Sequence, residues 1–306
     1  MLNIDVATIL FITIAMDSEK NATFASKSTA MMKHYLITIA LCLAACAATP
    51  TNSHQPVADA DAVAIDTTPE KSTQALQQPV DTIPEGARKL MQSYPNLNLR
   101  YADNQIIFPD GEGIVYDDGR QKSFIEQLDD CDIEDMFAMK YDTVTMPPQY
   151  LQDCGRGRCE ALYKKMYGNS AAAVQKNLDK VSWFGQQIPM TRVNGVADTL
   201  RAIAKELSGK PHLAKYFAQS SSFYWRQVRG ANRLSAHSYG IAIDINVANS
   251  TYWLWANKGK SETDTIKYSN KIPMEIVKVF EKHGFIWGGR WYHYDTMHFE
   301  YRPELL

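Results

Sequence analysis

The sequence lacks several features that would assign it to a specialised class of protein. Its 32 lysines and arginines nearly balance 34 aspartates and glutamates, so no excess of positive charge favours binding to nucleic acid. Five cysteines in 306 residues are too few for a fold built on disulfides. With 45% hydrophobic residues, the composition also excludes wholesale disorder, a collagen-like repeat and a polytopic membrane protein. These absences leave an ordinary globular protein of one or two domains.

A short apolar run near the amino end has the pattern of an export signal. Residues 31–34 include a basic start, residues 35–43 are apolar but too short to span a bilayer comfortably, and Leu-Ala-Ala-Cys ends the run at Cys46. This ending resembles a bacterial lipobox, which implies cleavage before Cys46 and attachment of lipid to its thiol. Ala47 then indicates the outer membrane. We predict a protein of the bacterial cell envelope, lipid-anchored on the periplasmic side; a plain secretory leader is the alternative.

The segments on either side of this signal have different characters. Residues 1–30 contain a second apolar run and fit the signal poorly, so they are interpreted as an upstream extension. We expect translation to begin at Met31 or Met32, with an unusually long signal region as the alternative. Residues 47–85 contain no aromatic residue, and such a stretch buries too little apolar surface to fold. They predict a flexible linker between the lipid anchor and a folded domain.

Patterned sequence begins near Gly86 and continues to the carboxyl end. Residues 99–108 and 114–116 flank a Pro-Asp-Gly turn and predict a hairpin. Residues 133–180 indicate mixed to helical structure. We divide the folded region into residues 86–186, whose role is unassigned, and a domain over residues 187–306.

Two helices are predicted in the second part. Apolar residues at helical spacing follow Asn194, which is expected to cap the first helix, and Gly209 ends it. Pro273 opens the second helix and Gly284 follows its end.

Two strands are predicted in the same part. Residues 241–247 alternate with a period of two, and residues 297–301 resemble a second strand. Helices beside a small antiparallel sheet indicate the α+β class.

Three cysteines lie in the region that we expect to be exported, where disulfides can form. They are Cys131, Cys154 and Cys159. We predict one structural bridge and leave open which two cysteines pair. A zinc knot is less favoured because no fourth cysteine or histidine lies nearby.

Residue types that carry chemistry gather in two segments, 235–244 and 295–300. Asp244 lies within an otherwise apolar strand, where a carboxylate is costly unless a metal ion, an arginine or a hydrogen-bond network compensates it. His237 precedes this strand, and His298 alternates with apolar neighbours in the second segment. Two histidines and one aspartate suit zinc, and three protein ligands leave a fourth position for water, as in catalytic zinc sites.

The two segments together resemble a known family. Ser235, His237, Gly240, Ala242 and Asp244, followed by a late histidine with an acid three residues before it, resemble VanY/VanX-type D-alanyl-D-alanine carboxypeptidases. This family of zinc metallopeptidases also contains L-alanyl-D-glutamate endopeptidases. The resemblance covers about residues 187–306. Trp-Gly-Gly at residues 287–289 resembles the endopeptidase branch, although Arg290 stands where its members often carry aspartate.

The resemblance implies a hedgehog/DD-peptidase-like zinc metallopeptidase core with particular roles at the site. His237, Asp244 and His298 match the zinc ligands. Asp295 matches the general base, and Arg226 matches the arginine that holds the substrate carbonyl or carboxylate.

Other residues near the motifs have two interpretations each. Glu300 is a rival base or orients a ligand histidine. Ser235 and Tyr239 contact substrate or serve turn formation and packing. Of the tryptophans that crowd this half of the chain, most are expected in the core and one or two in a groove. His283 and His293 lie outside the spacing of the motif and are not expected to bind metal.

We therefore predict a Zn²⁺-dependent metallopeptidase that cleaves peptidoglycan stem peptides in the manner of a D-alanyl-D-alanine carboxypeptidase. Attack by zinc-bound hydroxide with Asp295 as general base is the implied mechanism. An L-Ala-D-Glu-type endopeptidase of the same family is one alternative. The other is a zinc-stabilised cell-wall binding module that no longer cleaves, as the similar metal site of the hedgehog signalling domain illustrates. No nucleic-acid partner is expected.

Overall fold

The computed structural model of the protein describes residues 83–306. The extension over residues 1–30, the signal ending at Cys46 and the linker up to residue 82 lie outside the described residues. Within residues 83–306, no helix combines the length and apolar character needed to cross a membrane.

Short helices alternate with three small antiparallel sheets, which confirms the predicted α+β class. The helices are α2 (Glu85–Ser93), α3 (Phe124–Asp129), α4 (Glu160–Tyr167), α5 (Ala171–Gln175), α6 (Val196–Ser208), α7 (Trp253–Ala256) and α8 (Met274–Lys282). The strands are β1 (Arg100–Ala102), β2 (Gln105–Ile107), β3 (Gly113–Val115), β4 (Leu178–Trp183), β5 (Gln186–Thr191), β6 (Ala242–Asp244), β7 (Phe285–Trp287) and β8 (His298–Tyr301).

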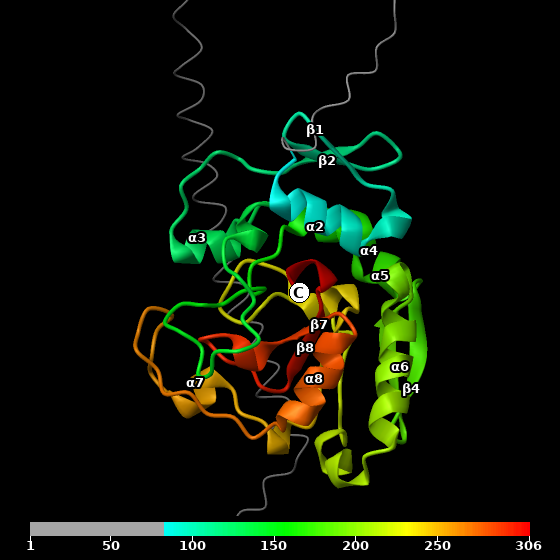
Figure 1. Ribbon diagram of the computed structural model, residues 1–306, viewed down its shortest axis with the longest axis vertical. Helices are drawn as coiled ribbons and strands as arrows, with labels where there is room; N and C mark the ends of the chain where they lie inside the picture. Colours follow the sequence, from blue (N-terminus) through cyan, green and yellow to red (C-terminus); the bar gives the residue numbers. More distant parts are fainter. Residues whose placement is uncertain (1–82) are drawn as a thin grey trace, which may run out of the picture. The chain divides into compact units, whose positions relative to one another are not determined.

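The sheet that positions the candidate site has the strand order β6-β8-β7. Its antiparallel register sets Asp244 opposite His298 and Ile243 opposite Phe299. Because successive side chains of a strand point to opposite faces, one face is apolar and the other carries the polar residues of the motifs. Ile243, Phe299 and Trp287 are fully buried on the apolar face. Phe299 stacks on Phe280 of α8 with ring centroids 4.0 Å apart, and Figure 1 shows α8 beside β7 and β8.

Residues before position 187 cover the polar face of this sheet. The chain comes close to the sheet at Gly155, which has φ +95° and where an added Cβ would lie 2.3 Å from Cδ1 of Ile286. A glycine is needed there because a side chain would collide with β7. Near the same point, the guanidinium of Arg158 pairs with the buried Glu300 of β8 at 3.0 Å. The segment 86–186 and the sheet therefore share one packed interior.

A second contact ties the start of the described chain to its end. The side chain of Tyr94, directly after α2, donates a hydrogen bond of 2.7 Å to Glu304. Arg302 bonds the same carboxylate at 2.5 Å. All three residues are buried, so the carboxylate of Glu304 is satisfied by partners within the protein, as buried polar groups generally are.

Several predicted elements are confirmed and others are wrong. Gly209 directly follows the end of α6, and α8 follows Pro273, as predicted. The predicted hairpin around the Pro-Asp-Gly turn at residues 109–111 is confirmed as β2 and β3. A further turn within residues 99–108 was not predicted, and it separates β1 from β2. Asp103 and Asn104 make that turn with φ of +49° and +57°, a conformation that aspartate and asparagine tolerate better than most residues.

The predicted cap of α6 is wrong. Gly195 is the residue that precedes the helix, with φ +73°. Asn194 has φ +55°, and its side-chain amide donates to the hydroxyl of Tyr167 at 3.2 Å. The side chain is thus used for a tertiary contact and does not bond to the first turn of the helix.

The predicted disulfide is absent from the described part of the chain. Cys131, Cys154 and Cys159 are all free, and burial raises the pKa of each thiol. Cys154 packs in a small cluster with Ile286, whereas Cys159 belongs to the main core. The bridge was predicted from the expected compartment and the number of cysteines alone, and these packing environments separate Cys154 from Cys159.

Replacing Gly240 by alanine is expected to destabilise the protein by about 3 kcal/mol. Gly240 has φ +68°, and an added Cβ would lie 2.7 Å from Leu178 and 3.2 Å from the backbone nitrogen of Thr191. Gly119 is a matched control with φ +72° and no atom within 4 Å, so its alanine variant should lose only about 1 kcal/mol. Urea unfolding of both variants measures the difference. Equal losses would show that packing around Gly240 is not required.

Candidate metal centre

Three local structures bring the side chains of the two motifs together. His237 lies on the 3-10 turn Ala236–Tyr239, where the hydroxyl of Ser235 accepts a bond from the backbone nitrogen of His237. Gly240 ends this turn in the left-handed conformation and leads into β6. Asp244 is the last residue of β6, and His298 is its direct neighbour at the start of β8. Cross-strand neighbours on one face lie close together.

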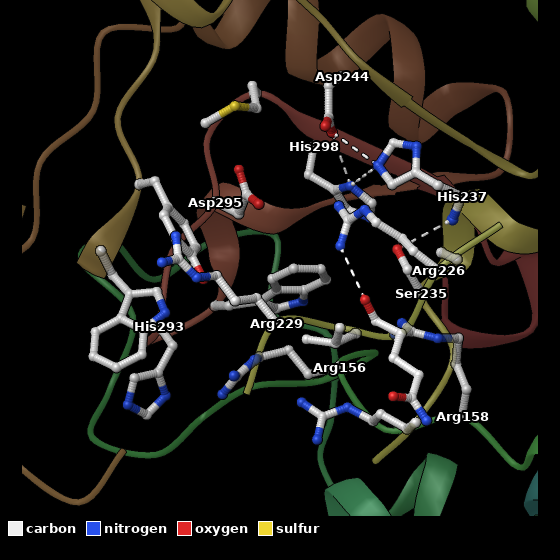
Figure 2. A pocket seen from close by; sticks show the side chains of 18 of the residues that line it. Arg156, Arg158, Arg226, Arg229, Ser235, His237, Asp244, His293, Asp295 and His298 are labelled. Atoms are coloured by element: carbon white, nitrogen blue, oxygen red, sulfur yellow. Dashed lines mark hydrogen bonds and ion pairs between the residues drawn. The ribbon is translucent and has the colours of Figure 1, made fainter. Parts of the chain in front are cut away.

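The three potential ligand atoms converge on one point. Oδ1 of Asp244 lies 3.2 Å from Nε2 of His237 and 3.0 Å from Nδ1 of His298. The two imidazole nitrogens are 3.2 Å apart, and Figure 2 shows the three side chains pointing toward one another. Tetrahedral zinc ligands at about 2.0–2.1 Å from the ion lie roughly 3.3 Å from each other. The spacing of these atoms is therefore that of zinc ligands.

Hydrogen bonds on the outer sides of the histidines orient the lone pairs inward. Nδ1 of His237 lies 2.9 Å from the backbone oxygen of Ser222, which can only accept, so in a neutral ring Nε2 carries the lone pair. Nε2 of His298 lies 3.4 Å from a carboxylate oxygen of Glu300, which leaves Nδ1 as the inward lone pair. With both rings neutral, two lone pairs and a carboxylate face one another, and this donor set fits zinc.

The electrostatics of the group favour positive charge. Burial by itself raises the pKa of Asp244, but His237 and His298 outweigh it and hold this pKa well below its usual range. Burial acts against the charged form of His298, but hydrogen bonds to Asp244 and Glu300 raise its pKa to about 10. A cation between these residues is therefore stabilised by the carboxylates around them.

Asp295 lies beside this group and has a carboxylate oxygen that is not engaged. Its Oδ1 is buried without a hydrogen-bond partner among residues 83–306, and it lines the same cavity as the ligands (Figure 2). Burial and the negative charge of Asp244 raise the pKa of Asp295 to about 7. A carboxyl group in this environment is able to exchange a proton near neutral pH.

Glu300, the rival base, is in a different situation. It is fully buried, with Arg158 at 3.0 Å and Arg302 at 3.3 Å. Burial opposes its ionisation, but Arg158, His298 and Arg302 together lower its pKa to about 2. A paired carboxylate that contacts the outer nitrogen of His298 fits the orienting role better than that of a base.

Of the remaining predicted site residues, Arg226 and Ser235 line the cavity, whereas Tyr239 does not. Arg226 is exposed on the cavity wall, has no carboxylate partner among the described residues, and donates to the backbone oxygen of Gln227 at 3.3 Å. Ser235 both lines the cavity and caps the turn. Tyr239 is 1% exposed and packs against Tyr163, away from the cavity lining. Substrate contact by Tyr239 is therefore not seen, because its ring is directed into the core.

The cavity itself has a volume of about 560 Å³ and includes residues that the sequence patterns did not reveal. Arg156 and Arg158 line it from the segment before residue 187. They stand in Gly-Arg-Gly-Arg between Cys154 and Cys159, a segment whose pattern indicates only a possible disulfide. Three tryptophans also line it, Trp253, Trp255 and Trp291, more than the one or two expected.

His293 is buried at the edge of this cavity, where its Nδ1 lies 2.5 Å from a carboxylate oxygen of Asp153. Asp153 also pairs with Arg156 at 3.0 Å. The imidazole of His293 is thus bonded to the segment that covers the sheet.

A comparison with protein families matches the segment that carries the candidate metal ligands. Residues 229–301 match the family model described as D-alanyl-D-alanine carboxypeptidase, which confirms the family predicted from the motifs. The match contains His237, Asp244, Asp295 and His298. It is shorter than the predicted resemblance and does not reach Arg226. No curated protein matches the chain.

Replacing Arg158 by methionine is expected to lower the free energy of unfolding by about 3 kcal/mol, because a buried carboxylate loses a partner. Arg201→Met on α6 is the matched control. Arg201 pairs with Asp179 and Asp198 but is 42% exposed in its side chain, so less than about 1 kcal/mol is expected. Thermal or urea unfolding gives both values. A similar small loss for both variants would contradict a structural role for the Arg158–Glu300 pair.

Proposed function

We propose that the protein is a zinc metallopeptidase that removes the terminal D-alanine from peptidoglycan stem peptides. The observation that supports this most strongly is the convergence of His237, Asp244 and His298 within the segment that matches the carboxypeptidase family. The sheet β6-β8-β7, with these ligands on one face, then corresponds to the hedgehog/DD-peptidase-like core.

The chemistry divides between the ion and the residues around it. When bound, zinc supplies Lewis acidity that polarises the peptide carbonyl and makes water a stronger nucleophile near neutral pH. Asp295 has the free carboxylate oxygen beside the ligands, so we assign it to accept the proton of the attacking water and return it to the leaving amine. Glu300 holds His298 in the orientation that keeps Nδ1 toward Asp244.

Arginines on the cavity wall favour removal of a terminal residue over cleavage within the stem. A carboxypeptidase needs a positive group for the carboxylate of the last residue. Arg226 and Arg229 both line the cavity, and neither has a carboxylate partner among residues 83–306. We assign the terminal carboxylate, or the developing charge of the carbonyl oxygen, to Arg226. An L-Ala-D-Glu-type endopeptidase remains the alternative outcome of the test below.

We further propose that the enzyme works at the bacterial cell envelope. The support is the export pattern that ends at Cys46, together with the linker composition up to residue 85. Lipid on Cys46 would hold the peptidase on the periplasmic side, and Ala47 favours the outer membrane.

Zinc binding should depend on the three ligands. Asp244→Asn is expected to weaken zinc affinity by more than about 100-fold, because the anionic ligand is lost. Asp264→Asn is the control, since Asp264 is bonded to Ser261 away from the cavity. Competition with a chromophoric chelator measures both affinities without any assay of activity. Unchanged affinity in Asp244→Asn would contradict the assigned ligands.

Hydrolysis should depend on Asp295 separately from zinc binding. The full-length chain with zinc is incubated with purified peptidoglycan, and the products are identified by mass spectrometry. Loss of terminal D-alanine is expected. Asp295→Asn should lower kcat by roughly 10²–10⁴-fold while zinc stays bound.

The products of the same digestion discriminate between the functional alternatives. Cleavage within the stem would establish the endopeptidase instead. Cell-wall binding with no released product, unaffected by a chelator, would favour a binding module and contradict the peptidase.

A further inference from the structure

The cavity wall has an uneven distribution of charge. Among its lining residues in the described chain, the carboxylates are Asp244 and Asp295, and both belong to the metal centre. Five arginines line the rest. They are Arg156, Arg158, Arg226, Arg229 and Arg233. Figure 2 shows Arg156, Arg158 and Arg229 below the His237, Asp244 and His298 group in this view.

The buried arginines are held from behind by carboxylates that do not line the cavity. Arg158 bonds Glu300, and Arg233 bonds Asp129. Their residues are only 7% and 6% exposed, and yet the Nε of each lacks a hydrogen-bond partner within residues 83–306. These two Nε atoms are covered by protein, but both residues line the cavity, so their guanidinium groups add positive charge to its wall.

These guanidinium groups also repel one another. Burial lowers the pKa of Arg233, and the positive charges of Arg156 and Arg158 lower it further. Arg229 adds an exposed guanidinium on the same wall, with no carboxylate partner in the described residues. An anion among these groups would relieve the repulsion, since arginine pairs favourably with carboxylates.

We propose that Arg158, Arg229 and Arg233 form a second anion subsite that binds a carboxylate of the substrate other than the terminal carboxylate at Arg226. The substrate is then an acidic peptide with at least two carboxylates. This inference rests on the proposed function for the identity of the peptide. Apolar walls from Trp253, Trp255 and Trp291 fit the intervening residues of such a peptide.

The subsite also assigns a role to the segment before residue 187. Arg158 comes from that segment, whereas Arg229 and Arg233 come from the family-matched segment. The matched region carries the proposed zinc ligands. Substrate selection would therefore also use Arg158, a residue outside that region.

Two matched pairs of synthetic pentapeptides test the subsite on the full-length chain with zinc. One pair has D-glutamate or D-isoglutamine at the second position. The other has meso-diaminopimelate or L-lysine at the third position. In at least one pair, the peptide with the extra carboxylate should have a KM lower by about tenfold, as expected for a charge-assisted hydrogen bond.

Variants then locate the effect. Arg229→Gln and Arg233→Gln should each reduce that preference to less than about threefold, and Arg229→Lys should retain part of it because the charge remains. Arg229 is exposed, so its variant serves even if Arg233→Gln does not fold. Arg201→Gln, outside the cavity, is the control that should keep the full preference.

The possible results separate this inference from the proposed function. Equal KM values within both pairs, or a preference that persists in both glutamine variants, would overturn the subsite and leave the peptidase intact. If no peptide is cleaved, the proposed function fails, and tryptophan fluorescence titration with the same peptides decides the subsite. Tighter binding of the peptide with the extra carboxylate, lost in Arg229→Gln, would support it, and equal binding would overturn it.

Discussion

The structure around the metal centre depends on the buried carboxylate of Glu300. It lies on β8, two residues after His298, and contacts that histidine, Arg158 and Arg302. A carboxylate without exposure to solvent is stable only if charges and hydrogen bonds compensate it. Arg158 comes from the segment before residue 187, so compensation of Glu300 also fixes that segment against the sheet. The same carboxylate orients His298 toward Asp244, which joins the stability of the fold to the geometry of the ligands.

This arrangement gives residues 86–186 a structural role beside the domain over residues 187–306. The apolar face of β6-β8-β7 is covered by α8, but its polar face carries Asp244, His298 and Glu300. Residues near Gly155 cover that face, and Arg156 and Arg158 from the same loop form part of the cavity wall. The segment matched to the carboxypeptidase family supplies the proposed ligands and base. The segment before it supplies two arginines of the cavity wall and covers the buried carboxylate of Glu300.

Sequence reasoning identified the motif residues because their chemistry is unusual for their local context. Asp244 in an apolar strand and His298 beside apolar neighbours were recognisable within a few residues, and β-strand register then sets them opposite each other. Arg158 was missed because it meets Glu300 across 142 residues of chain, and no local pattern encodes such a contact. The turn between β1 and β2 was not predicted, because Asp103-Asn104 is a weaker turn signal than the Pro-Asp-Gly that joins β2 to β3. Asn194 was predicted to be a cap because local sequence does not reveal its tertiary hydrogen bond to Tyr167.

The central claim is that His237, Asp244 and His298 hold one zinc ion. Crystals of the zinc-loaded protein, with diffraction recorded on both sides of the zinc absorption edge, test it most directly. The account predicts an anomalous peak within about 2.0–2.2 Å of Nε2 of His237, a carboxylate oxygen of Asp244 and Nδ1 of His298. A peak bound through Nε2 of His298, or zinc only at the acidic side chains around Asp132, would contradict it.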